Sequence, residues 1–154
     1  MDEKYCKFKK FDKEQYNEVT RFLKKRTHLT AREWAIARLC ADFQHSGRSE
    51  ITRIGEHLPE LVPFMKEPYS RQAVSMARSA FKKKVLKSGT TFFYAYYSGL
   101  ISMEDIVDMI HQISENIEYL LNVGEGGIPK GDLDVEVQQE VVEVLRQIND
   151  AFRD

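Results

Sequence analysis

The chain has 154 residues, of which 42% are hydrophobic and 31% charged, a balance typical of one globular domain or of a domain with a helical extension. Cys6 and Cys40 form no CxxC pair, so we expect a reducing cytoplasm and no disulfide framework. No apolar run reaches the roughly 18 residues that a membrane helix needs, and the charged N-terminus is not a secretory signal. We therefore expect a soluble, cytoplasmic protein with no membrane partner.

The net charge of −1 conceals two halves of opposite sign. Residues 1–100 contain 20 Lys and Arg against 11 Asp and Glu, whereas residues 101–154 contain 3 against 13. This asymmetry predicts a basic helical bundle over 1–100 that faces a polyanion, followed by an acidic helical hairpin over 101–154 that dimerises or binds a partner. The alternative is that the two halves attract each other within one fold.

The first two predicted helices each begin with a capping-box pattern. Asp12 and Gln15 open a helix over 13–26, which ends in the basic cluster KKR, where positive charge complements the helix C-terminus. Thr30 and Glu33 open the next helix, which ends at a His-Ser-Gly turn.

Helical periodicity then predicts a short helix over 52–57 and a long one over 70–87. Three prolines interrupt the segment between them, so we expect only one helical turn there, over 60–65. Ser70 is placed to cap the long helix, and the Ser-Gly pair that follows Lys87 is placed to stop it.

The segment 90–97, with the sequence TTFFYAYY, is ambiguous. Its β-branched and aromatic residues suit a strand, such as one half of a wing hairpin. Gly89 and Gly99, however, bracket it as helix stops do, and no partner strand is apparent. We interpret it as a short buried helix and keep the wing strand as the alternative.

Two acidic helices are predicted over 102–121 and 133–152, joined by the Gly-rich linker 122–131. Apolar residues recur along them at steps of three and four: Met103, Ile106, Ile110, Ile113, Ile117 and Leu120 in the first, and Val137, Val141, Val144, Ile148 and Phe152 in the second. Such heptad seams favour helix pairing. The simplest arrangement is an antiparallel hairpin, and a homodimer through the same two helices is the alternative.

The segment YSRQAVSMARSAFKKKVLK separates apolar from basic side chains around one helix. The face predicted to be buried consists of Val74, Ala77, Phe81 and Val85. The candidate nucleic-acid-binding residues are Arg71, Gln72, Ser75, Arg78, Lys82, Lys83, Lys84 and Lys87. We expect the first four to approach base edges in the major groove and the lysines to hold phosphates. The alternative is a solvated charged face on a core helix.

The string ITRIGEHL, followed by a turn and then SRQAVSMA, resembles the second and third helices of helix-turn-helix regulators over about 35 residues. It departs from that pattern at the connection, where about twelve residues replace a tight turn of three or four. The chain as a whole, especially TAREWAIARLCADF and IGEHLPELVPFM, is similar to an uncharacterised archaeal protein family. That second resemblance implies no biochemical activity.

These patterns predict an all-α fold, with a helix-turn-helix-containing N-terminal bundle followed by an antiparallel helical hairpin. The predicted function is DNA binding, as a transcriptional regulator or chromatin-associated factor, with double-stranded DNA as the partner. No catalytic or nucleotide-binding motif occurs, so we expect no enzymatic activity, cofactor or metal. One alternative is a protein-interaction adaptor whose basic face docks on an acidic partner. The other is an enzyme that binds a metal through Asp108, His111 and Glu115.

Overall fold

The structure is a computed structural model that describes residues 13–62, 65–125 and 133–152. Its helices are α1 (Lys13–Arg26), α2 (Ala31–Asp42), α3 (Ile51–Glu56), α4 (Leu58–Leu61), α5 (Arg71–Tyr97), α6 (Met103–Glu125) and α7 (Leu133–Phe152). One antiparallel pair of two-residue strands, β1 (Gln44–His45) and β2 (Arg48–Ser49), joins α2 to α3. The predicted all-α class is therefore confirmed. Within the described ranges, none of the helices combines the length and the apolar character needed to cross a membrane.

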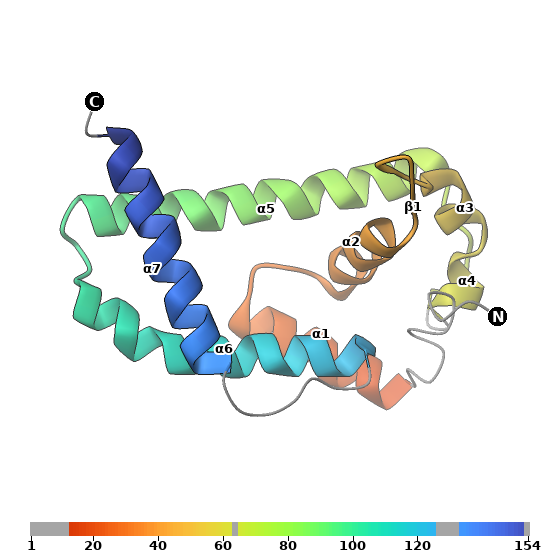
Figure 1. The fold of residues 1–154 in the computed structure, drawn as a ribbon. Coiled ribbons are helices and arrows are strands. Elements are labelled where there is room, and N and C mark those ends of the chain that lie inside the picture. The colour runs from red at the N-terminus through yellow and green to blue at the C-terminus, as the bar shows by residue number, and fades with distance from the viewer. Residues whose placement is uncertain (1–12, 63–64, 126–132, 153–154) are drawn as a thin grey trace. The chain divides into compact units, whose positions relative to one another are not determined.

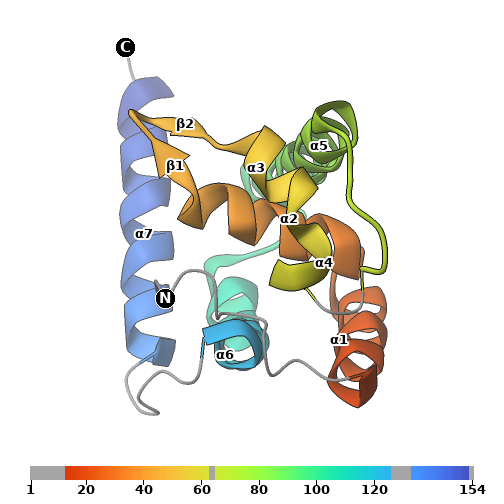
Figure 2. The same cartoon turned by 90° about the vertical axis from the view of Figure 1, so that its right-hand side faces the viewer.

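The chain divides into two compact units, and the division falls inside α5, between Phe92 and Phe93. The first unit contains α1 to α4 and most of α5, and α2 lies between α1 and α5 (Figures 1 and 2). Its buried core is formed by Val19, Leu23, Ala35, Ile36, Leu39, Cys40, Ile54, Leu58, Leu61 and Val74. Each large apolar side chain buried in this way contributes about 1.5–3 kcal/mol to folding.

The helix starts are the most accurately predicted features. Glu33 N donates to Thr30 Oγ1 at 3.1 Å and Thr30 N donates to Glu33 Oε1 at 2.9 Å, which completes the predicted capping box of α2. Ser102 and Asp105 exchange the same pair of hydrogen bonds at the start of α6. Ser70 also caps α5 as predicted, through a hydrogen bond from Ala73 N. These motifs are local, so neighbouring residues suffice to specify them.

The predicted end of the long helix is wrong, because α5 runs without interruption through Gly89 to Tyr97. The hydroxyl groups of Thr90 and Thr91 donate to carbonyl oxygens four residues earlier, at 2.9 and 3.0 Å. A glycine ends a helix when it adopts a positive φ, and Gly99 does so at 76°. The expected separate helix over 90–97 is thus the last part of α5, and its residues are exposed or half-buried rather than buried.

The connections differ from their predictions by a few residues. The second helix ends at Asp42, and the chain then forms the β1–β2 hairpin. Its two-residue turn, Ser46 and Gly47, has positive φ at both positions, which is the geometry of a type I′ turn. The single turn expected over 60–65 is α4, which begins earlier, at Leu58. The Asp12 part of the first predicted capping box lies outside the described residues.

The second unit follows the predicted seams only in part. Ile106 and Ile110 of α6 are buried as expected, but Met103 at the start of the seam is exposed. In α7, Leu145 is buried whereas Val144 of the predicted seam is exposed. The side chains of Val137, Ile148 and Phe152 lie outside the described residues. The antiparallel packing of the two helices stays a prediction, because their connection and the first side chains of α7 lie outside the described residues.

The start of α5 is held against α3 by one close backbone contact. Tyr69 N donates to the carbonyl oxygen of Gly55 at 2.9 Å. A Cβ atom on Gly55 would overlap the carbonyl oxygen of Tyr69 and approach Val74 Cγ2 to 3.2 Å. Only glycine therefore allows the segment before α5 to lie this close to α3.

The middle of α5 is held against α2 by a charged pair. Lys84 Nζ lies 2.5 Å from Glu33 Oε1, the same oxygen that accepts the hydrogen bond from Thr30 N. Glu33 is only 8% exposed. Burial alone raises the pKa of this carboxyl, but the hydrogen bonds from Lys84 and Thr30 outweigh burial and hold the pKa of Glu33 below its ordinary value of 4.5.

Gly55→Ala should destabilise the protein by about 1–3 kcal/mol, because the new methyl group meets backbone that has no room to move. Gly89→Ala is the matched control, since nothing lies within 4 Å of a Cβ atom there. That control should instead stabilise the protein by about 0.5–1 kcal/mol, the helix preference of alanine over glycine. Urea unfolding of both variants tests the contact, and equal effects of the two changes would contradict it.

Glu33→Gln should lower the free energy of unfolding at neutral pH by about 1–3 kcal/mol, since Lys84 loses its partner. A carboxyl whose pKa is lowered on folding stabilises the protein above its unfolded pKa and stops doing so as the pH falls through its folded pKa. The variant should therefore lose less stability than the wild type when the pH falls from about 6 to below 4.5. Chemical unfolding across this range, with the exposed Glu67→Gln as control, measures the difference; parallel curves for wild type and Glu33→Gln would refute the assignment.

Candidate nucleic-acid interface

The helix α5 carries an unusual charge distribution along its 27 residues. It contains six basic side chains and no acidic one. All six lie in the part of the helix that belongs to the first unit: Arg71, Arg78, Lys82, Lys83, Lys84 and Lys87. A helix with this composition has a strongly positive surface wherever its side chains reach solvent.

Most of the predicted contact residues do reach solvent. The exposed members are Arg71, Gln72, Ser75, Lys82, Lys83 and Lys87. Arg78 is half-buried at the edge of this surface, and Val74 is fully buried on the other side of the helix. The predicted inner face ends early, because Ala77 and Phe81 are half-buried and Val85 is 53% exposed. Hence α5 packs on the core mainly through its first three turns.

Lys84 is the predicted site residue whose surroundings differ most from expectation. Its ammonium group is paired with the buried carboxylate of Glu33, which turns the side chain towards α2. Lys82 and Lys83, by contrast, are both exposed. The three-lysine run thus divides into two solvent-facing cations and one structural cation.

The N-terminal end of the exposed face continues onto α3. Arg71 Nη1 lies 3.5 Å from Thr52 Oγ1, and both residues line a shallow pocket of about 370 Å³. Arg53 lies in the same pocket, and its guanidinium group is paired with Glu50 at 3.2 Å. The sequence pattern did not indicate this second arginine, since only the fold brings α3 beside the start of α5.

Two large apolar side chains are also exposed on the polar face, and the sequence analysis missed both. Met76 is 65% exposed and Leu86 is 70% exposed. Met76, Ser79, Lys83 and Leu86 follow one another at steps of three and four, so they lie on one side of the helix. The exposed face is therefore basic with an apolar component.

The alternative metal site on α6 gains no third ligand. His111 Nε2 lies 3.1 Å from Glu115 Oε1, and both side chains are exposed. Among the described residues, no group of three or more His, Cys, Asp or Glu side chains is arranged to hold a metal ion.

Burial raises the pKa of the Cys40 thiol, which makes this core cysteine a poor nucleophile.

The helix-turn-helix resemblance stays a prediction, since the one-turn helix α4 stands between α3 and α5 where a simple turn is expected. Neither a curated protein nor a solved structure matches the chain significantly. A family model does match, over residues 7–154, and its description is "Family of unknown function (DUF5806)". The chain belongs to this family.

Proposed function

We propose that the protein binds double-stranded DNA through the exposed face of α5, as a transcriptional regulator or chromatin-associated factor. The observation that carries this proposal is the charge of α5, which has six basic and no acidic side chains. Arg71 and Gln72, in the first turn, offer the forked and paired groups that read guanine and adenine edges. Ser75 and Arg78 follow on the same side of the helix and approach the bases with them.

The phosphate contacts in this proposal come from Lys82, Lys83 and Lys87. All three are exposed, and none has an ion-pair partner within the described part of the chain. Phosphate contacts supply most of the affinity and all of its steep salt dependence, whereas base contacts supply specificity. Lys84 is left out of the proposed contact set because its charge is already neutralised by Glu33.

A protein-interaction adaptor is the second candidate, and the exposed Met76 and Leu86 favour it. Apolar side chains of this size gain little beside phosphate groups, but they are common anchors at protein interfaces. In this second function the same face would dock on a partner that presents carboxylates around an apolar patch. It requires the purified protein to show no affinity for duplex DNA at physiological salt.

Lys82→Gln combined with Lys83→Gln should weaken duplex binding and lower the slope of log Kd against log salt by about 2, one for each lost phosphate contact. Lys13→Gln combined with Arg21→Gln removes the same charge from exposed positions on α1 and should change Kd less than about twofold. Fluorescence anisotropy with a mixed-sequence duplex over a salt series measures both. If both pairs of substitutions had equal effects, or if the wild type did not bind, the proposed interface would be wrong.

The proposal includes a homodimer through α6 and α7, the helices predicted over 102–121 and 133–152. Exposed apolar side chains on both helices support it: Met103, Val107, Met109, Val142 and Val144. A dimer would present two copies of α5 to two half-sites on DNA.

Val107→Asp should convert such a dimer to a monomer, because a charge at an apolar interface has no partner there. Light scattering coupled to gel filtration measures the mass of wild type and variant. Asp108→Asn, on the neighbouring exposed position, should leave the mass unchanged. A wild type that is monomeric at high concentration would rule out this part of the proposal.

A further inference from the structure

A second basic surface lies away from the exposed face of α5, in a groove between the end of α1 and the middle of α5. The groove has a volume of about 560 Å³, within the range of small-molecule sites. Lys24, Lys25 and Arg26 come from the last turn of α1, and Lys84 comes from α5. His28, in the loop after α1, lies beside them. Two segments that are distant in sequence thus line one cavity. Its three cations on α1 have no ion pair with another described residue, whereas Lys84 is paired with Glu33.

No carboxylate balances these cations on the wall of the groove. None of its nine lining residues is acidic. The nearby carboxylate of Glu33 already accepts hydrogen bonds from Lys84 and Thr30. Lys24, Lys25 and Arg26 are exposed, and no ion pair joins any of them to another described residue. The groove therefore has a surplus of positive charge that only a ligand or solvent ions can neutralise.

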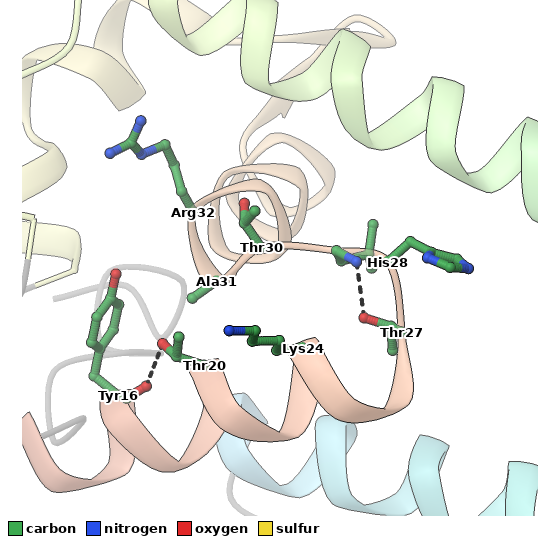
Figure 3. Close-up of a pocket in the computed structure, with 9 residues that line it drawn as sticks. Tyr16, Thr20, Lys24, Thr27, His28, Thr30, Ala31 and Arg32 are labelled. Atoms are coloured by element: carbon green, nitrogen blue, oxygen red, sulfur yellow. Dashed lines mark hydrogen bonds between the residues drawn. The ribbon is translucent and has the colours of Figure 1, made fainter.

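The loop that shapes the groove is held by its own hydrogen bonds. Thr27 Oγ1 donates to Leu23 O at 2.8 Å. It also accepts a hydrogen bond from Leu29 N at 2.9 Å, the dashed line that ends at Thr27 in Figure 3. Thr30 then caps α2 immediately afterwards. This short segment is fixed at both ends, so His28 and the last turn of α1 are presented in a defined arrangement.

The same loop separates the groove from a second cavity of about 630 Å³. Lys24 and His28 line both cavities, and Arg32 adds a further cation to the second (Figure 3). Hydroxyl groups of Tyr16 and Thr20 complete its polar wall, and again no carboxylate lines it. The positive surface therefore extends around the loop on both sides.

A simpler explanation is that the basic residues only neutralise the negative end of the α1 dipole. That end carries about half an elementary charge, which a single cation compensates. Three consecutive cations exceed this need, and Lys84 belongs to another helix. The dipole thus accounts for only part of the cluster.

We propose that this groove binds an oligophosphate, a ligand with two or three linked phosphate groups. Three consecutive cations with no counter-charge fit several linked anionic groups better than one, and Arg26 offers the forked donors that match phosphate oxygens. Val85 and Ser88 of α5 line the groove, whereas none of the side chains proposed to contact DNA does. The site therefore uses a different set of residues from the proposed DNA face.

Titration calorimetry with sodium tripolyphosphate at physiological salt tests the site. Lys24→Gln combined with Lys25→Gln should weaken binding at least tenfold, because it removes two cations from the same wall. Lys82→Gln combined with Lys83→Gln removes equal charge from α5 residues that do not line the groove and should leave binding within about twofold. Thermal melts monitored by circular dichroism verify that both variants fold. Replacing tripolyphosphate by ATP separates the two sources: tighter binding of ATP identifies a nucleotide, and equal binding identifies the inorganic chain.

Two results would overturn the site. One is the absence of tripolyphosphate binding to the wild type at millimolar concentration. The other is an equal loss in the two double variants, which would indicate attraction to overall charge rather than a groove. Duplex binding measured on the same variants keeps the two proposals apart. The proposed oligophosphate site stands if duplex affinity is absent but tripolyphosphate binding depends on Lys24 and Lys25. If Lys24→Gln with Lys25→Gln lost only duplex affinity, the groove would belong to the DNA-binding surface, and the oligophosphate proposal would be wrong.

Discussion

One oxygen atom of Glu33 connects the start of α2 to the middle of α5. It accepts hydrogen bonds from the backbone of Thr30 at the start of α2 and from Lys84 in the middle of α5. An uncompensated buried carboxylate would cost several kcal/mol, so the position of Lys84 is as constrained as the helix cap itself. This pair turns Lys84 towards α2, while Lys82 and Lys83 are exposed.

The attachment of α5 to the core is correspondingly polar. Val74 is its only fully buried side chain among the described residues, and Val85 is already half-exposed. The Gly55–Tyr69 contact at one end and the Glu33–Lys84 pair further along replace the apolar stripe that a core helix normally has. Few apolar contacts leave most of the helix circumference available to ligands. The six cations of this helix repel one another, which lowers the free energy of unfolding. A bound polyanion would offset that repulsion.

The capping motifs at helix starts are predicted correctly, whereas one helix end and some of the buried positions are not. The caps at Thr30, Ser70 and Ser102 involve side chains within three residues of their partners. By contrast, the Ser-Gly pair at Gly89 predicts a helix stop because glycine often has that role, but Gly89 does not adopt the positive φ that ends a helix. One position of the predicted α7 seam, Val144, is exposed instead of buried. Val144 and Leu145 are both apolar, and periodicity alone cannot decide which one the core will bury.

The sequence by itself determined that the chain is helical, where most helices begin, and that its positive charge is concentrated before residue 101. Those properties depend on composition and on interactions within one helical turn. Only the tertiary structure decided which cations are used internally and which face solvent. It also brought Lys84 to the end of α1 and thereby formed the basic groove, across about sixty residues of chain. Such pairings are set by the packing of whole helices, and no local pattern of residues encodes them.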